Sequence, residues 1–151
     1  MSVYAVLEKL GIQLPTAGAP AASYVMAAQA GDLVFLAGHI AKKGNDPWTG
    51  TLGATMSTDE GKAAARSVAI DLLATLHAHT GDLNRVRRIV KVMSLVRSTP
   101  EYTDQHLVTN GCSELLTDVF GEAGKHARSA FGVTSIPRGA CVEIELIAQL
   151  A

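Results

Sequence analysis

The chain has 151 residues, of which 48% are hydrophobic, and its 13 basic and 14 acidic side chains give a net charge of -1 at pH 7. This length and composition fit one compact domain with a core large enough to fold unaided. The near-neutral balance provides no general attraction to nucleic acid or to an anionic bilayer, so we expect neither as a partner.

The N-terminal part of the chain predicts a short helix, a linker and a β-hairpin. Apolar residues recur at helical spacing in residues 3–10 before Gly11, and this opening lacks the basic start and long apolar run of a signal peptide. Residues 12–23 form the linker. Two apolar runs within residues 23–40 are separated by Ala-Gly-Asp at 30–32, which is typical of a hairpin with its turn at the small residues.

A loop over residues 42–56 leads to the most clearly marked helix of the sequence. Ser57 and Glu60 have the spacing of a capping box, and Gly81 marks the end of the helix. One apolar stripe runs along it, formed by Ala65, Val68, Ala69, Leu72 and Leu76. The β-branched run 88–98 then predicts a strand.

A second helix and two strands complete the expected fold. Thr99-Pro100-Glu101 is expected to start a helix that Gly121 closes, with Asn110-Gly111 as a candidate interruption. Residues 128–136 and 140–150 predict strands. The order of elements predicts an α+β fold in which two helices cover one face of a mixed sheet. Self-association is the simplest way to cover the other face.

Three motifs that could suggest other chemistry fail on physical grounds. The run Gly-Glu-Ala-Gly-Lys at 121–125 has too few residues between its glycines for a phosphate loop, and His126 stands where Ser or Thr is needed. His77 and His79 lie two apart on a helix, so they point to different faces and cannot easily share a metal. No aromatic platform is interleaved with the cationic cluster Arg85, Arg87, Arg88 and Lys91.

The two cysteines also bear on location. Cys112 and Cys141 have neither a metal-site nor a CxxC spacing, so we expect both thiols to be reduced and unbridged. No segment reaches the length of a transmembrane helix. We therefore expect a cytoplasmic protein with a single domain over residues 1–151, in which residues 1–20 form an N-terminal helix and linker extension.

Arg128 opens a stretch, residues 126–133, that otherwise has the pattern of a buried strand. An arginine at a strand entrance can pair with a surface acid or extend to solvent. The alternative is an anion site, because a planar guanidinium binds a carboxylate through two parallel hydrogen bonds.

Several short segments of the chain are each too common to indicate a family, but their combination is specific. They are Ala127-Arg128-Ser129, the terminal run 142–148 (VEIELIA), Tyr24-Val25 at a fixed separation from 36–40 (LAGHI), and Asn110 followed four residues later by Glu114. Together they resemble the YjgF/RidA family, also called reactive-intermediate deaminases, over roughly residues 20 to 150.

The resemblance implies a chorismate-mutase-like α+β subunit that assembles as a homotrimer, with clefts between neighbouring subunits. It implies hydrolysis of reactive 2-imino acids, such as 2-iminobutanoate and 2-iminopropanoate, to 2-oxo acids and ammonia. Carried over residue by residue, Arg128 would bind the substrate carboxylate and Glu143 would hold the attacking water. Tyr24, Gly38 and Asn110 would line the pocket.

The residue types suit this chemistry. The carbon of a protonated imine is already electrophilic, so the site needs orientation and a general base, and no metal, covalent nucleophile or cofactor is expected. Glu143 and Glu145 are two apart and therefore share one face of the last strand. Plain solvent exposure is the alternative explanation for two acids on that face.

The chain departs from the deaminase pattern at two places. It has Ala-Gly-His-Ile-Ala at 37–41 where family members have Ser-Gly-Gln-Ile-Pro, and Arg-Ser-Ala at 128–130 where they have Arg-Ser-Cys. The N-terminal extension and the loop around Trp48 indicate a divergent branch with a longer chain. His39 is either a substitute polar group in the pocket or a histidine satisfied at the subunit boundary.

Two other functions stay open at this level. A non-catalytic protein of the same fold could use Arg128 to bind a small carboxylate metabolite. A ribonuclease or translation inhibitor would bind RNA through the cationic residues between 85 and 91, against which the acidic balance argues.

Overall fold

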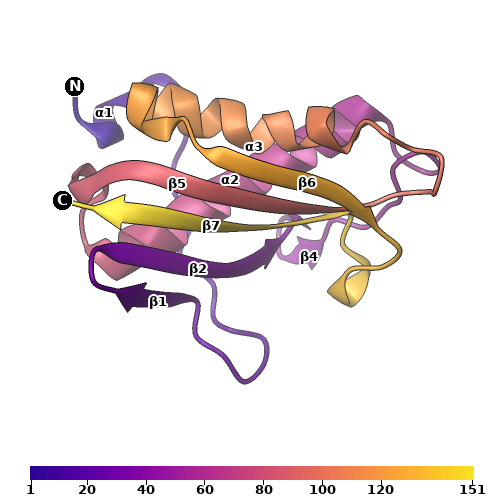
Figure 1. The fold of residues 1–151 in the computed structure, drawn as a ribbon, viewed down its shortest axis with the longest axis horizontal. Helices are drawn as coiled ribbons and strands as arrows, with labels where there is room; N and C mark the ends of the chain where they lie inside the picture. Colours follow the sequence, from indigo (N-terminus) through magenta and orange to yellow (C-terminus); the bar gives the residue numbers. More distant parts are fainter.

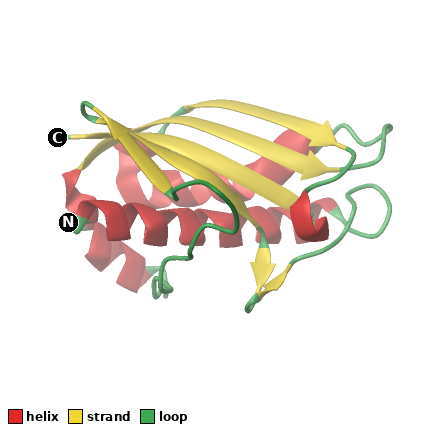
Figure 2. Cartoon of the chain, turned by 90° about the horizontal axis from the view of Figure 1, so that it is seen from below, coloured by secondary structure: helices red, strands yellow, loops and turns green.

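A five-stranded mixed sheet carries two long helices on one of its faces (Figures 1 and 2). The computed structural model describes residues 1–151, and its strand order is β1-β2-β7-β5-β6. The strands are β1 (Ala27–Ala30), β2 (Leu33–Ile40), β5 (Val86–Arg97), β6 (Ala127–Val133) and β7 (Val142–Leu150). β5 and β6 are parallel and the other neighbours are antiparallel. The predicted α+β class is confirmed.

The helices are α1 (Val3–Lys9), α2 (Thr58–Thr80) and α3 (Gln105–Phe120). Short 3-10 turns cover Leu83–Arg85, Gly121–Gly124 and Pro137–Gly139. The segment expected to be only a loop contains a small hairpin of β3 (Lys42–Lys43) and β4 (Asp46–Pro47). No helix is both long enough and apolar enough to cross a bilayer.

α2 forms as its sequence predicts. The Ser57 side chain accepts a hydrogen bond from the Glu60 N–H, and the Glu60 side chain accepts one from the Ser57 N–H, so the capping box is present. Gly81 ends the helix in the left-handed conformation. The predicted apolar stripe is buried against the sheet.

The core lies between the helices and one face of the sheet. Alternate residues of the central strand β7 point into it, and all of them are buried: Val142, Ile144, Leu146, Ala148 and Leu150. The intervening residues, Glu143 and Glu145 among them, therefore face the other side. The register of the last strand thus confirms that these two acids share a face.

No helix covers that second face, as Figure 2 shows. Phe35 and Phe131 are 42% and 44% exposed on it, and the half-buried side chains of Leu95 and Ile147 lie between them. An apolar surface of this kind is typical of an interface. The expected self-association stays a prediction, and the homotrimer with it.

The second long helix begins later than the sequence suggested. Residues 99–101 lie in a turn that the bond from the Tyr102 N–H to the carbonyl oxygen of Thr99 closes, and the Thr99 N–H donates to the carbonyl oxygen of Leu52 in the preceding loop. α3 begins at Gln105, whose side-chain amide donates to the carbonyl oxygen of Tyr102. The predicted start at Thr99-Pro100-Glu101 is therefore wrong.

The candidate interruption at Asn110-Gly111 is wrong as well, since α3 is continuous through both residues. Gly111 has a packing role instead. A Cβ at this position would collide with the carbonyl oxygen of Lys62, so the glycine lets α3 approach the backbone of α2.

Both cysteines are buried as free thiols. Burial raises the pKa of Cys112 to about 12 and that of Cys141 to about 11. The thiols are therefore protonated and inert near neutral pH.

Candidate functional site

A cavity of about 770 Å³ opens beside the end of β2. β1 starts only at Ala27, so the predicted first strand is shorter than its apolar run, and Tyr24 belongs to the linker that walls the cavity. Next to the β1–β2 pairing, the Ala37 N–H of β2 donates to the carbonyl oxygen of Met26, the residue before β1. Beyond it β2 has no strand neighbour on this side. The cavity brings together four predicted site residues: Tyr24, Gly38, His39 and Glu143.

The Glu143 carboxylate packs directly against Gly38. A Cβ built on Gly38 would lie 2.7 Å from Glu143 Oε2, so only glycine leaves room for the acid in this position. A β-bulge at residues 37–38 shifts the pairing of β2 with β7 and turns this part of β2 toward the acid. Burial, and then the negative charge of Glu145, raise the pKa of Glu143.

His39 lies on the helix side of the sheet and is only 8% exposed. Its Nδ1 lies 2.6 Å from the carbonyl oxygen of Ala37, which can only accept, so Nδ1 carries the proton. Nε2 then accepts a hydrogen bond from the Thr75 hydroxyl at 2.7 Å. Burial lowers the pKa of His39, in keeping with a neutral ring. His39 thus links β2 to α2, and its predicted contact with substrate stays a prediction.

Arg128 lies at the opposite edge of the sheet, on β6, with its side chain turned toward α3. Its Nη1 donates to Asn110 Oδ1 at 2.8 Å and to Ser113 Oγ at 3.2 Å, and its Nη2 donates to the carbonyl oxygen of His106 at 3.2 Å. Asn110, the remaining predicted residue, therefore positions Arg128. The structure has two ion pairs, Lys62–Glu114 and Lys125–Glu122. Neither includes Arg128, so no carboxylate pairs with its guanidinium.

His126 orients the Ser113 hydroxyl that accepts from Arg128. Its Nδ1 donates to the carbonyl oxygen of Gly124 at 2.6 Å, which leaves Nε2 to accept from the Ser113 hydroxyl at 2.9 Å. The Ser113 oxygen is then turned to accept from Arg128. Burial, opposed by the bond to Gly124 and reinforced by the charge of Arg128, lowers the pKa of His126.

The two groups of predicted site residues do not meet within one chain. β6 and β7 are separated by β5, which places Arg128 and Glu143 roughly 10 Å apart across the strands, and because Arg128 is level with Leu146 they are about as far apart along them. Their side chains also point to opposite faces, Arg128 toward α3 and Glu143 toward the uncovered face. Each edge of the sheet thus carries one half of the predicted site.

A family model described as "YjgF/chorismate mutase-like, putative endoribonuclease" matches residues 5–150. The chain belongs to this family. Among the relatives, the Protein TCP17 of Trypanosoma cruzi is 44% identical over 98% of this chain and 94% of its own length. The family resemblance seen in the sequence is therefore confirmed.

Two solved structures agree over almost the whole chain. One is the protein Atu1372 of Agrobacterium tumefaciens, of unknown function, with 36% identity, a TM-score of 0.91, and coverage of 99% of this chain and 92% of that one. The other is described as a putative endoribonuclease of Shewanella oneidensis, with 25% identity, a TM-score of 0.96, and coverage of 99% and 100%. These comparisons establish the YjgF fold and leave the activity open.

Three charged residues of the cavity escaped the sequence analysis: Lys42, Asp71 and Arg138. Asp71 interrupts an apolar run of α2, which is the one signal that could have drawn attention to it. Arg138 stands in a Pro-Arg-Gly turn, and nothing in its local pattern shows that it reaches a site that the linker completes.

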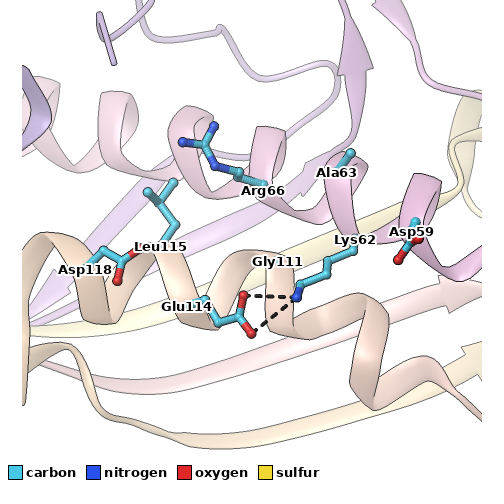
Figure 3. Close-up of a pocket in the computed structure, with 8 residues that line it drawn as sticks. All are labelled: Asp59, Lys62, Ala63, Arg66, Gly111, Glu114, Leu115 and Asp118. Atoms are coloured by element: carbon cyan, nitrogen blue, oxygen red, sulfur yellow. Dashed lines mark hydrogen bonds and ion pairs between the residues drawn. The ribbon is translucent and has the colours of Figure 1, made fainter. Parts of the chain in front are cut away.

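A second, smaller hollow of about 280 Å³ lies between α2 and α3 on the outer surface (Figure 3). Lys62 and Glu114 form an ion pair of 3.1 Å across it. Glu114 is thus engaged by α2 and takes no part in the group around Arg128. No cluster of three or more His, Cys, Asp or Glu side chains in the chain could hold a metal ion.

Proposed function

We propose that this YjgF-family chain hydrolyses reactive 2-imino acids to 2-oxo acids and ammonia, in sites that form between the subunits of a homotrimer. The observation that carries the proposal is the fit of Glu143 against Gly38 in a large cavity at one edge of the sheet. An unpaired, pre-oriented guanidinium at the other edge supplies the complementary half.

Arg128 is the carboxylate anchor in this proposal. Asn110 and Ser113 accept from the same nitrogen, and the carbonyl oxygen of His106 accepts from the other terminal nitrogen, so the guanidinium plane is fixed before a ligand arrives. Pre-orientation of this kind reduces the entropy lost on binding. A 2-imino acid carboxylate then places the adjacent imine carbon at a fixed distance from the guanidinium.

Glu143 is the general base. It accepts a proton from water as the water oxygen bonds to the imine carbon, and the C=N electron pair moves to nitrogen to give a carbinolamine. The acid returns that proton to nitrogen, and the C–N bond breaks as Glu143 takes the hydroxyl proton, which gives the 2-oxo acid and ammonia. Ammonia then takes up this proton from Glu143 and leaves as ammonium, so the carboxylate is restored. The raised pKa of Glu143 suits a group that must both accept and return a proton.

Assembly explains why the halves stand at opposite edges. A ring of three subunits, each presenting its β6 edge to the β2 edge of the next, repeats one heterologous contact and closes. The exposed Phe35 and Phe131 lie near these two edges on the uncovered face, where the ring would bury them. Each contact then unites Arg128 of one subunit with Glu143 of its neighbour.

A coupled assay tests the proposal. An amino-acid oxidase generates 2-iminopropanoate or 2-iminobutanoate continuously, and the release of ammonia is followed with and without the protein. We expect the release to exceed the spontaneous rate in proportion to protein concentration. Equal rates with and without protein, at several imines, would leave a non-catalytic carboxylate-binding protein as the better description.

The endoribonuclease descriptions of relatives supply a second candidate function. The cationic residues near β5 offer little support for it. Arg85 donates to the carbonyl oxygen of Thr80, and Lys91 lies 3.4 Å from Ser129 Oγ, so both cations have partners within the fold. Salt-sensitive binding of single-stranded RNA by the purified protein would revive this candidate.

A further inference from the structure

The cavity beside Glu143 is larger than a three- or four-carbon imine requires. Such an acid fills at most roughly 200 Å³, if each non-hydrogen atom is given the volume of a water molecule. The cavity measures about 770 Å³. The uncharged N-terminal linker forms one wall of this cavity, and Lys42, Asp71 and Arg138 line it from other elements, so a longer substrate side chain would find polar contacts there.

Lys42 is the first charged group of this wall. Strand alternation sends its neighbour Lys43 the other way, where the Lys43 ammonium lies 4.8 Å from the centre of the Trp48 ring. Lys42 lines the cavity instead, and its Nζ would lie 3.9 Å from a Cβ on Gly18 of the linker. It is half-buried and belongs to neither ion pair of the structure. A half-buried ammonium without a counter-ion favours an anionic ligand.

Arg138 is the second cation on the wall. It is the one non-glycine residue of the chain with positive φ, at 62°, and it sits in the turn closed by the bond from the Gly139 N–H to the carbonyl oxygen of Ile136. Such conformations are unfavourable for residues with a Cβ and gather at ligand sites. Arg138 is exposed and has no ion-pair partner, so its guanidinium is free to bind an anion at the mouth of the cavity.

Asp71 moderates the charge of Lys42. It lies on α2 within the same cavity, where burial raises its pKa and the charge of Lys42 acts against that rise. Lys42 and Asp71 are too far apart to form an ion pair. The carboxylate therefore weakens the positive field around Lys42 without occupying its hydrogen-bond donors.

We propose that Lys42 and Arg138 bind a second anionic group, so that the preferred substrate is a 2-imino acid with a further acid at the end of its side chain. This inference rests on the proposed function for the positions of the first carboxylate, at Arg128 of the neighbouring subunit, and of the imine, at Glu143. The linker holds the substrate side chain between these two ends. Lys42 and Arg138 are thus specificity-determining residues.

Calorimetry with stable 2-oxo acids tests the inference independently of turnover. 2-Oxoglutarate and 5-methyl-2-oxohexanoate have the same number and arrangement of non-hydrogen atoms. The second compound has an isopropyl group in place of the terminal carboxylate. We expect the wild-type protein to bind 2-oxoglutarate about tenfold more tightly, in line with a charged hydrogen-bonded contact. 3-Phosphooxy-2-oxopropanoate, compared in parallel, shows whether a carboxylate or a phosphate is the better end group.

Four variants locate the effect. Lys42→Met and Arg138→Asn should each reduce the preference for 2-oxoglutarate several-fold and leave 5-methyl-2-oxohexanoate binding unchanged. Asparagine tolerates the left-handed backbone at 138, so the turn should survive. Lys43→Met is the matched control and should change nothing. Asp71→Asn should increase the preference, because it removes a negative charge from the same wall.

Equal wild-type affinity for 2-oxoglutarate and 5-methyl-2-oxohexanoate would overturn the inference, as would a loss in Lys43→Met as large as in Lys42→Met. The deaminase proposal fails differently. If no imine is hydrolysed but the preference and its dependence on Lys42 persist, the anionic subsite stands in a binding protein and the catalytic role of Glu143 falls.

Discussion

The Glu143 carboxylate fills the space that a side chain on residue 38 would occupy, with Oε2 only 2.7 Å from the Cβ position. Gly38→Ala should therefore displace the acid and lower imine hydrolysis by about 10- to 100-fold, within the range for loss of a general base. Circular dichroism should show an intact fold. In the double variant with Glu143→Gln, the rate should fall no further than in Glu143→Gln alone, because both changes remove one function.

Glu143→Gln keeps the shape of the side chain and removes its charge. Imine hydrolysis should fall by roughly 10²-fold while binding of 2-oxobutanoate changes little. Glu145→Gln is the matched control, since that residue is exposed and lies two positions further along the same strand face, about 6–7 Å away. It should keep activity but shift the acid limb of the pH profile to lower pH, because the charge of Glu145 helps raise the pKa of Glu143. Wild-type activity in Glu143→Gln would exclude it as the base.

Glu143→Gln should also stabilise the fold at neutral pH. Because the pKa of Glu143 is raised above its usual 4.5, the folded chain binds this proton more tightly than the unfolded chain does. The stabilisation from that proton is complete below pH 4.5 and is lost as the pH rises through the folded pKa. Glu143→Gln should thus have a higher Tm than wild type at neutral pH, and the difference should vanish in acid. Calorimetric scans across this range measure it.

The local signals in the sequence predict most of the fold, but they indicate only some of the residues that line the candidate cavity. Capping-box spacing and glycine predicted α2 correctly, since both act within a few residues. Thr99-Pro100-Glu101 does not start α3, because these residues form a turn that the Tyr102 N–H closes on the carbonyl oxygen of Thr99. Sequence motifs predict Glu143 and Arg128 as site residues. No local pattern predicts Lys42 and Arg138, because only tertiary packing brings them to the cavity. No periodicity in one chain shows which edge of a sheet faces a neighbouring subunit.

His39 should make the fold acid-sensitive. Burial lowers its pKa below the usual 6.5, so its contribution is present above that pH and is lost as the pH falls through the folded pKa. His39→Gln cannot titrate and carries the residue that deaminase members have here. Urea unfolding at pH 7.5 and pH 5.5 should show a smaller loss of stability in the variant than in wild type. His126, whose pKa is lowered too, accounts for part of the loss that persists.

The carboxylate anchor can be tested by binding alone. Arg128→Ala should weaken 2-oxobutanoate binding by about one to two powers of ten, or ~1.5–3 kcal/mol for a charged hydrogen-bonded contact. Arg87→Ala is the control, because Arg87 is an exposed arginine on β5 outside the cavity. Equal affinities in wild type and Arg128→Ala, measured by calorimetry, would remove Arg128 from the site.

Mixed assemblies test whether Arg128 and Glu143 act across a subunit boundary. Arg128→Ala and Glu143→Gln should each be nearly inactive alone, since every site lacks one half. In a trimer that contains both kinds of subunit, one contact pairs the intact Arg128 of one variant with the intact Glu143 of the other. Random mixing in equal amounts gives such trimers in three cases out of four, each with one intact site of three. About one quarter of wild-type activity should therefore return.

Differently tagged variants, co-expressed and purified through both tags, provide the mixed assemblies, and a mixture of separately folded trimers that do not exchange subunits is the control. Sedimentation equilibrium must first show a trimer, because a monomer would remove the basis for sharing a site. If doubly tagged trimers form and stay inactive, the two residues do not complete one another across the contact. If activity returns only in the doubly tagged fraction, the guanidinium at the β6 edge and the acid beside Gly38 belong to one composite site. Their separation within one chain, across the strands and along them, is then a consequence of assembly.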